Sequence, residues 1–381
     1  MLYPRYCTEK YLDQYMWYFL EAYIDSLGFS KMAKTYKDLF DQIIQFDHLY
    51  SSYISARKGK RRKLPCRTFE QDLEGNIISI QNDLIWGTYK TGGYKEFYVH
   101  EPKTRKVVAL HLFRDRVVQH AIMKVIEPIW ESRFISDSYA CRISKGTHKG
   151  ADKVQIMMRR CLKNHGKIFA LKADIRRYFA SISHEKLKNL LRQRISDDKA
   201  LKLIDGIIDS YNEIDTPGKG LPIGNLTSQL FANIYLDHLD QWIKFNKREK
   251  WYARYMDDFI LIHQDKRHLQ SLRFDIERFL QDELDLRTND KTAIFPVAHH
   301  QGRGLDFLGY HLWPHGRRLR KQSLKRFKRR VRTLQKHYAE SRINISNIHE
   351  QLSSMIAHAK HGNAHRAIEK VLENSTFRRL A

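Results

Sequence analysis

Cysteine and proline are scarce in this sequence, and their scarcity excludes several architectures. The four cysteines, Cys7, Cys66, Cys141 and Cys161, form no CxxC pair, so neither a zinc finger nor a disulfide framework is indicated. Only 8 prolines occur, and no Gly/Ser-rich or Pro-rich linker interrupts the 381 residues. Because 42% of the residues are hydrophobic, the chain can build a substantial core, and we expect two or three subdomains.

Long apolar runs are absent as well. No run approaches the roughly 18 residues that a membrane span requires, and the N-terminal sequence lacks the basic, apolar and small-residue regions of a signal peptide. The phosphate-binding pattern GxxxxGK[ST] does not occur, so no ATP-driven motor is expected. The sequence therefore predicts a cytoplasmic protein in a reducing compartment, without a membrane partner.

Acidic residues are outnumbered: 68 Lys and Arg face 43 Asp and Glu, which gives a net charge of +25. A folded chain this basic usually binds a polyanion, because neutralised phosphates release their counterions. The cations cluster at 56–67 and at 316–336, and the second block contains no acid. Apolar residues recur through it at spacings of three to five, which predicts an amphipathic helix with a basic outer face. They are Leu319, Leu324, Phe327, Val331 and Leu334.

The apolar spacing predicts an α+β protein with a small antiparallel sheet. Helices are expected up to about residue 60, followed by strand-like alternation at 85–112 with a turn at "EPKT". Further on, the pattern predicts helices at 115–130, 184–195, 199–211, 226–245 and 267–285, strands at 167–179 and 305–313, and basic helices to the end.

Three aspartates interrupt apolar strands where a polar turn would serve. Asp257 and Asp258 stand in "WYARYMDDFILI", and Asp174 ends "IFALKAD". Asp197 and Asp198, by contrast, precede a helical pattern, so we interpret them as a solvated helix N-terminus. Carboxylates beside apolar surface need a positive partner, either arginine or, where several converge, divalent cations. Two neighbouring strands could hold two ions about 4 Å apart, although a solvated hairpin turn is the simpler alternative.

Two other groups of polar residues are interpreted as structural. Asp237 and Asp240 lie on the long predicted helix that precedes the hairpin, and we expect them to face water. His358, His361 and His365 suggest a metal cluster, but a glycine interrupts their helix and no carboxylate joins them. We therefore expect no metal at these histidines.

An ordered set of motifs resembles those of the reverse transcriptases. "RYMDDF" is similar to their catalytic box, and "LKADIRRYF" to their first carboxylate motif. "PKTRKVVAL", "FRDRVVQHAI" and "DSYACRISKGTHKG" resemble the fingers motifs, "GLPIGNLTSQ" the template-contacting loop, "LRTNDKTAI" the lysine-bearing motif and "GLDFLGYHLWP" the primer grip. The set spans residues 97 to 313.

The resemblance implies an α+β right-hand polymerase that copies template RNA into cDNA from a primer and dNTPs. The expected parts are an N-terminal helical extension (1–65), fingers (66–165), a palm with a small antiparallel sheet (166–315, including helices at 184–212 and the primer grip at 305–313) and a basic helical thumb (316–381). The chain stops shortly after the thumb, so no RNase H, protease or endonuclease domain is expected.

The resemblance also implies a metal site and a proton donor. Asp174 and Asp257, joined by the carbonyl of Ile175, would hold two Mg²⁺ ions, for which Mn²⁺ can substitute. Asp258 is either a further ligand or a residue that tunes the site. Lys291 is a candidate general acid for the leaving pyrophosphate, with a plain surface charge as its alternative.

Contacts to nucleotide, primer and template are implied in the same way. Lys103 and Arg105, two apart in an extended stretch, would clamp the triphosphate, unless they form a solvated hairpin tip. Phe179 falls at the sugar-gate position, where an aromatic ring selects deoxynucleotides, or is an ordinary core aromatic. The remaining candidates are Gly224 and Gln229 for the dNTP, Phe307, Leu308, Gly309 and Tyr310 for the primer grip, and Arg326, Arg329 and Arg330 for nucleic acid.

Two positions of the template-contacting loop indicate which group of reverse transcriptases this chain resembles. The loop usually ends in Ser-Pro and carries Gln before its Gly, whereas this chain has Gln229 and Ile223 there. With "YACR" and "KGTHKG", these departures resemble the bacterial or phage-encoded enzymes of diversity-generating retroelements, which miscopy template adenines and use a basic accessory protein, here expected as an oligomer. Ile223 cannot hydrogen-bond as Gln would, so one check on pair geometry is lost; alternatively, Ile223 only packs.

Two rival hypotheses remain open. A defence-associated reverse transcriptase, acting against phage, would share this core, and the unassigned N-terminal extension is compatible with it. A catalytically silent nucleic-acid-binding scaffold fits the charge but leaves three strand-end aspartates without a purpose.

Overall fold

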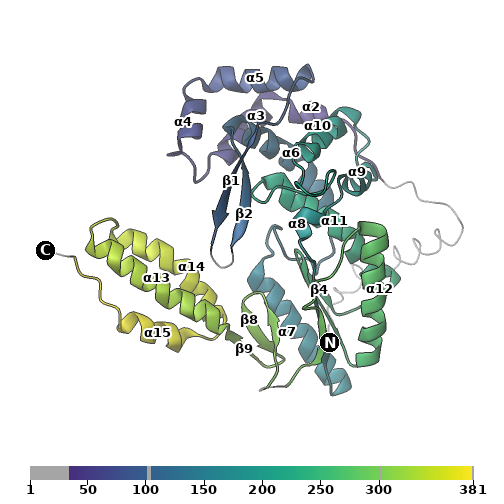
Figure 1. The fold of residues 1–381 in the computed structure, drawn as a ribbon, viewed down its shortest axis with the longest axis vertical. Coiled ribbons are helices and arrows are strands. Elements are labelled where there is room, and N and C mark those ends of the chain that lie inside the picture. The colour runs from purple at the N-terminus through teal and green to yellow at the C-terminus, as the bar shows by residue number, and fades with distance from the viewer. Residues whose placement is uncertain (1–33, 101–103, 300–301, 380–381) are drawn as a thin grey trace, which may run out of the picture.

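The computed structural model describes residues 34–100, 104–299 and 302–379, and it has three parts (Figure 1). A helical part with a projecting hairpin lies at the top, a sheet-based part lies below it, and the C-terminal helices lie to one side. This mixture of helices and small antiparallel sheets confirms the α+β class. The helix expected around residues 12–23 and most of the expected turn at 101–104 lie outside the described residues.

The upper part is built around α6 (Phe113–Glu131), which is buried along most of its length and packs against α3 (Phe46–Ala56) and α11 (Leu226–Gln241). Shorter helices surround it: α2 (Leu39–Ile43), α4 (Leu64–Glu70), α5 (Leu73–Ile85), α9 (His184–Arg192) and α10 (Asp198–Asp209). The antiparallel hairpin of β1 (Tyr94–Val99) and β2 (Arg105–Leu110) projects downward from these helices in Figure 1.

The acidic pair at the start of α10 differs in part from the expectation. Asp197 caps the helix by accepting from the Ala200 N–H at 3.0 Å, as predicted. It also accepts from the Phe40 N–H at 2.8 Å and is half-buried, so it is not solvated. The acid therefore joins α10 to α2, while Asp198 stays exposed in the first turn.

The middle part contains a four-stranded antiparallel sheet in the order β4-β5-β3-β6. Its strands are β3 (Phe169–Asp174), β4 (Tyr252–Tyr255), β5 (Asp258–His263) and β6 (Ala293–Pro296). Alternate residues of β5 face two different cores, as the two-residue period of a strand requires. Phe259 and Leu261 share a core with α12 (Lys266–Leu284), whereas Ile260 and Ile262 share one with α7 (Thr147–His165).

The C-terminal part joins a small sheet to three helices. The sheet consists of β7 (Leu305–Phe307), β8 (Tyr310–Trp313) and β9 (Gly316–Leu319), so the strand pair expected at 305–313 is confirmed. The helices are α13 (Lys321–Ala339), α14 (Ile345–His361) and α15 (His365–Glu373), and their apolar faces form a core of their own.

Two predicted element boundaries were wrong. The basic block begins as β9, and its helix starts only at Lys321, where pairing with β8 ends. The strand expected at 167–179 ends at Asp174, and α8 (Tyr178–Ser181) follows it. The helix expected at 226–245 is confirmed: it is α-helical to Gln241 and continues as the π-helical turn η1 (Trp242–Asn246). None of the described helices has both the length and the apolar character of a bilayer span.

Candidate active site

The three strand-end aspartates meet at one edge of the four-stranded sheet. β3 and β5 run antiparallel with Asp174 directly opposite Asp258, a pairing that brings the two side chains to one face with Cβ atoms about 5 Å apart. Asp257 occupies the turn between β4 and β5, beside Met256, whose φ is 56°. The Ile175 N–H donates to the Asp257 carbonyl at 3.3 Å. The expected convergence of Asp174 with the hairpin tip is therefore observed.

The carboxylates at this edge are not fully neutralised by nearby positive charge. Burial, together with the nearby Asp174, raises the pKa of Asp257. Burial also raises the pKa of Asp258 to about 6; Lys172, at 3.6 Å from its Oδ2, acts in the opposite direction. The other oxygen, Oδ1 of Asp258, is buried without a hydrogen-bond partner. An unpartnered carboxylate oxygen is costly unless a cation or donor joins it.

These carboxylates fit a magnesium site of a particular kind. Across the described residues, no three His, Cys, Asp or Glu side chains converge closely enough to hold a metal without other ligands. Mg²⁺, however, is usually held by one or two carboxylates together with water and substrate phosphates. The unpartnered oxygen of Asp258 and the mutual repulsion of the three acids are compatible with such a site, which the substrate would complete.

A cavity of about 770 Å³ opens beside the aspartates. Asp174, Asp258 and Lys291 line it, together with cations from the β7–β9 sheet. Asn289 holds the end of β3, because its N–H and its side-chain amide donate to the Asp174 carbonyl and carboxylate at 2.6 and 3.3 Å. The Asn289 side chain in turn accepts from the Lys291 N–H at 3.1 Å. The loop that carries Lys291 is thus joined to Asp174 itself.

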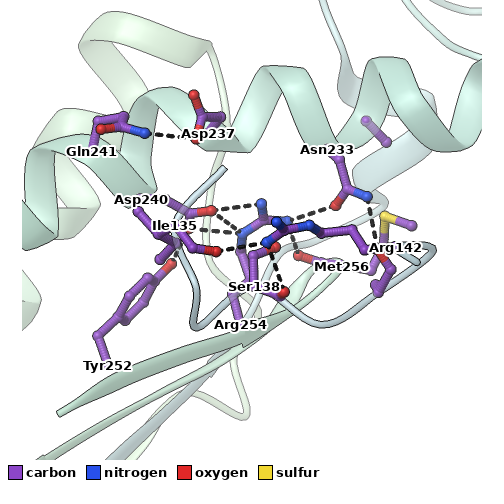
Figure 2. A network of polar contacts seen from close by, with 12 residues as sticks. Ile135, Ser138, Arg142, Asn233, Asp237, Asp240, Gln241, Tyr252, Arg254 and Met256 are labelled. Carbon is purple, nitrogen blue, oxygen red and sulfur yellow. Dashed lines mark hydrogen bonds and ion pairs between the residues drawn. The ribbon is translucent and has the colours of Figure 1, made fainter. Parts of the chain in front are cut away.

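A fully buried ion pair between α11 and β4 supports the turn (Figure 2). Arg254 on β4 and Asp240 on α11 both have 0% exposure, and Arg254 Nε and Nη2 donate to the two Asp240 oxygens at 2.7 Å each. The Tyr252 hydroxyl donates to the same carboxylate at 2.6 Å. Arg254 Nη1 donates to the Met256 carbonyl at 3.0 Å, inside the turn. Burial alone would lower the pKa of Arg254, but Asp240 raises it above its ordinary value.

The expectation that Asp237 and Asp240 face water was therefore wrong. Asp240 is the partner of Arg254, and Asp237, 3% exposed, accepts from Arg133 Nε at 2.9 Å. Burial and the neighbouring Asp240 raise the pKa of Asp237. Helix α11 is buried on all sides, so acids in it need internal partners, and those partners come from other segments.

The segment that reads "DSYACR" covers the outer edge of β4. The Arg254 N–H donates to the Asp137 carbonyl at 3.0 Å, and the Tyr139 N–H donates to the Arg254 carbonyl at 2.9 Å. Arg142 holds this segment by donating to the Ser138 carbonyl and to Glu131. The edge strand beside the aspartates is thereby paired and protected.

Of the residues expected at the nucleotide site, those that the structure describes lie on α8, in the 217–225 loop, on β2 and in the first turns of α11. Phe179 is half-buried in α8, and the Leu221 N–H donates to its carbonyl at 2.8 Å, which brings the 217–225 loop onto α8. Ile223 is 38% exposed, and its carbonyl accepts from the Val108 N–H of β2 at 2.8 Å. Gly224 has φ 133°, and a Cβ there would lie 3.0 Å from the Val108 carbonyl oxygen, so a side chain would be strained and would crowd the backbone of β2.

Two other candidates of the nucleotide site are exposed. Arg105 begins β2 and acts on Asp257, whose pKa it lowers against the effect of burial. Gln229 lies in the first turns of α11. Lys103 lies outside the described residues.

The expected primer grip forms the turn between β7 and β8. Phe307 and Tyr310 are buried, whereas Leu308 and Gly309 make the turn with φ of 50° and 91°. Lys172 donates to the carbonyl of Asp306 at 2.6 Å, so one side chain contacts both the aspartates and this hairpin.

Tyr310 also connects the hairpin to α7 and to α14. Its hydroxyl lies 2.9 Å from His148 Nδ1 and 2.8 Å from His358 Nδ1. His361 approaches Asp152 at 3.2 Å in the same cluster, while His365 pairs with Glu369 instead. The three histidines at 358, 361 and 365 therefore do not come together.

The three arginines of α13 differ in their surroundings. Arg326 is half-buried near His358; burial lowers the pKa of His358, and His148, His361 and Arg326 add to this shift. Arg330 is exposed and donates to Gln351, and Arg329 is exposed beside it on α13. The sequence reasoning missed Arg254, Asp240, Lys172 and Asn289. A charged Arg254 inside an otherwise apolar strand was the one available indication of a buried partner.

Comparison with known proteins identifies a family and several relatives of this chain. The chain matches the family described as reverse transcriptase (RNA-dependent DNA polymerase) over residues 94–312. Protein YkfC of Escherichia coli K12 is 29% identical over 272 residues, 61% of this chain and 70% of that protein. The group II intron-encoded protein LtrA of Lactococcus lactis subsp. cremoris is 26% identical over 207 residues, 52% of this chain and 33% of LtrA.

Among solved structures, apo telomerase from Candida tropicalis aligns with a TM-score of 0.49 and 11% identity, over 76% of this chain and 60% of that chain. The family match covers more than half of this chain and includes the segments that carry Asp174, Asp257 and Asp258. The chain therefore belongs to the reverse transcriptase family of RNA-dependent DNA polymerases, which are nucleotidyltransferases with a right-hand fold.

Proposed function

We propose that this chain adds deoxynucleotides to a primer, copying template RNA, at the edge where β3 and β5 end. The observation that carries the proposal is the buried Asp258 Oδ1 without a hydrogen-bond partner, beside two further carboxylates. Placing three acids together costs free energy, since each disfavours ionisation of the others. A scaffold that only held nucleic acid would gain nothing from that cost, whereas a magnesium-dependent enzyme requires the arrangement.

Asp174 and Asp257, with the carbonyl of Ile175, are proposed to hold two Mg²⁺ ions, for which Mn²⁺ can substitute, and Asp258 to add its free oxygen. Such ions, when bound, activate the primer hydroxyl and stabilise the leaving pyrophosphate. Lys291, which lines the same cavity as Asp174 and Asp258, is well placed to give a proton to that pyrophosphate.

The dNTP is proposed to lie between the aspartates and the β1–β2 hairpin. Arg105 acts on Asp257 electrostatically, which supports a role in clamping the triphosphate, with Lys103 as its partner on sequence grounds. Phe179 would exclude a 2′-hydroxyl, and Gly224 and Gln229 would line the pocket. The turn at 307–310 would hold the primer end, and Arg326, Arg329 and Arg330 would contact the duplex backbone.

We also propose that copying is error-prone at template adenines, as in a diversity-generating retroelement with a basic accessory protein oligomer. The supporting observation is Ile223: its main chain is fixed to β2 while its aliphatic side chain remains 38% exposed at the proposed pocket. An exposed aliphatic group cannot test the hydrogen-bonding edge of a pair. Ile223→Gln should reduce errors opposite adenine, and an unchanged error spectrum in sequenced cDNA would rule this role out.

The polymerase proposal is tested by primer extension on an RNA template with Mg²⁺. Asp257→Asn should reduce dNTP incorporation by at least about a thousandfold, with the affinity for primer–template measured in EDTA unchanged. Asp198→Asn is the matched control, because it removes an exposed carboxylate from a helix terminus. Full activity in the Asp257 variant, or none in the wild type, would end the proposal.

A further inference from the structure

Lys172 contacts a carboxylate of the candidate active site, although an ammonium cannot itself be a metal ligand. It lies on β3 two residues before Asp174, so both side chains point to the same face of the sheet. Its ammonium lies 3.6 Å from Asp258 Oδ2 and donates to the Asp306 carbonyl at 2.6 Å. One positive charge is therefore shared between the start of β5 and the β7–β8 hairpin.

The Lys172 side chain is confined by its surroundings. Only 25% of it is exposed, and it lines the cavity of about 770 Å³ beside the aspartates. Its backbone is paired on both sides, because β3 is an inner strand in which Lys172 lies opposite Ile260 of β5 and Ala293 of β6. A long side chain that is confined in this way loses rotamer freedom on folding, so its two contacts must offset that cost.

The contact between Lys172 and Asp258 involves one carboxylate oxygen only. Lys172 approaches Oδ2, while Oδ1 is buried and has no hydrogen-bond partner. The ammonium lowers the cost of keeping three carboxylates together in a partly buried site, which is also what a bound metal ion would do. It does so without occupying Oδ1, so that oxygen is left for a metal ion.

The Asp306 carbonyl that holds the ammonium is fixed by contacts of its own. Asp306 pairs with His311 across β7 and β8. Its carboxylate accepts from Arg320 Nε at 2.9 Å, and His311 Nδ1 lies 3.0 Å from the same oxygen. Because the carbonyl belongs to a paired strand whose side chain is also anchored, it can hold the Lys172 ammonium at a defined place beside Asp258.

We propose that Lys172 is a positioning residue that takes the place of a cation in the metal-free enzyme, and that the β7–β8 hairpin holds it there through the Asp306 carbonyl. The inference rests on the proposed polymerase function, because a metal site is what gives the free Asp258 oxygen a use. Lys172 then has two separate effects. Its charge competes with an incoming divalent cation, whereas its hydrogen bond keeps the hairpin seated against the four-stranded sheet.

The first test measures Mn²⁺ binding by the full chain without nucleic acid, from the electron paramagnetic resonance signal of the free ion. Lys172→Met should bind Mn²⁺ about tenfold more tightly than the wild type, because a charge that competes with the ion is lost. Lys172→Arg keeps the charge and should bind Mn²⁺ as the wild type does. A merely structural lysine would leave the Mn²⁺ affinity unchanged or lower it when replaced.

The second test measures the affinity for primer–template in EDTA. Lys172→Met should bind it about fivefold more weakly, because the hairpin loses the donor to its Asp306 carbonyl.

Lys186→Met is the matched control for both tests. Lys186 of α9 pairs with Asp285 at 3.1 Å and donates to the Asp282 carbonyl at 2.9 Å, and 28% of its side chain is exposed. The control therefore removes the same charge and the same two kinds of contact away from the aspartates. It should leave the Mn²⁺ affinity and the primer–template affinity unchanged.

Melting temperatures separate a loss of charge from a loss of packing. Lys172→Met should melt below the wild type in EDTA and recover most of the difference in saturating Mg²⁺, which a packing defect would not do. If Lys172→Met does not fold, Lys172→Gln removes the same charge and should give the same gain in Mn²⁺ affinity.

Three results would overturn the inference: unchanged or weaker Mn²⁺ binding in Lys172→Met, unchanged primer–template affinity in that variant, or equal effects in Lys186→Met. Failure of the polymerase proposal is recognised differently. In that case the wild type would incorporate no dNTP on any template, whereas both binding tests are made without dNTP.

Discussion

Arg254 and Asp240 are the residues on which the geometry of the aspartate turn depends. Both are fully buried, and the desolvation of such a pair consumes much of its Coulomb attraction. The pair is therefore weak grounds for expecting extra stability. Its distinctive contact is the Arg254 donation to the Met256 carbonyl, which fixes a residue at positive φ next to Asp257. We regard Arg254 as a positioning residue.

Arg254→Met should destabilise the fold by about 3–5 kcal/mol, because Asp240 would be left as an uncompensated buried charge. The double variant with Asp240→Leu should recover part of this loss, although the Tyr252 hydroxyl still lacks its acceptor. Primer extension should stay at least about tenfold slower in the double variant, since the Met256 carbonyl has no donor. Urea unfolding and single-turnover rates measure the two effects separately.

A control for this experiment is the ion pair of Asp237, which lies on the same helix as Asp240. Arg133 pairs with Asp237 but is 30% exposed, so Arg133→Met should cost less stability and leave the extension rate unchanged. A double variant of Arg254 and Asp240 with the wild-type rate would show that the pair does not position the turn.

At the residue scale, the sequence was informative at positions where a charged residue interrupts the apolar pattern of a strand. Asp174 and Asp257 stood out because acids at the ends of apolar strands have no local explanation. Asp240 did not stand out, because an acid on a helix normally faces water and its partner lies on a strand of another segment.

At the scale of elements, the hairpin of β7 and β8 connects the four-stranded sheet to the C-terminal helices. Lys172 reaches it from β3, and the Tyr310 hydroxyl lies between His148 of α7 and His358 of α14. Gly309 is packed so closely that a Cβ would lie 3.0 Å from His358 Nε2. These contacts join the hairpin closely to α14.

Tyr310→Phe should remove the hydrogen bond that joins the β7–β8 hairpin to His358 of α14, while the buried ring stays in place. We expect a cost of about 1 kcal/mol in stability, a severalfold drop in the number of nucleotides added per binding event, and little change in the rate of the first addition. Processivity on a long template with a trap measures the effect.

Tyr338→Phe on α13 is the control for the Tyr310 variant, because that ring packs on Phe377 within the thumb. An unchanged processivity in Tyr310→Phe, or an equal drop in both variants, would contradict the coupling.

Most elements were predictable because amphipathic periodicity reports burial directly. Helix α13 is an example: Phe327, Val331 and Leu334, chosen on spacing alone, are all buried. The misplaced start of α13 has a physical cause. β9 is short, basic and half-exposed, and only its pairing with β8 makes it a strand, so its own sequence does not distinguish it from the helix that follows.

At the scale of the whole molecule, the charge of +25 predicts strongly salt-dependent binding of template. If Arg326, Arg329 and Arg330 each contact a phosphate of the duplex, changing all three to Gln should reduce the slope of log K against log salt by about 3. Anisotropy titrations between low and moderate salt measure the slope.

The control is a triple variant in which Lys247, Arg248 and Lys250 are changed to Gln. It removes the same charge from a region near Trp251. It should lower affinity slightly and leave the slope nearly unchanged. Equal slopes for both triples would mean that the thumb arginines do not touch the backbone.

The placement of β5 between two cores has a consequence for how the molecule opens. Successive residues of this strand pack into opposite cores. Separating the strand from the rest of the molecule therefore requires the loss of packing in both cores. Its amide protons should therefore exchange with solvent only through global unfolding. Asp258 is the first residue of that strand. The aspartate edge of the sheet therefore belongs to the segment that we expect to unfold last.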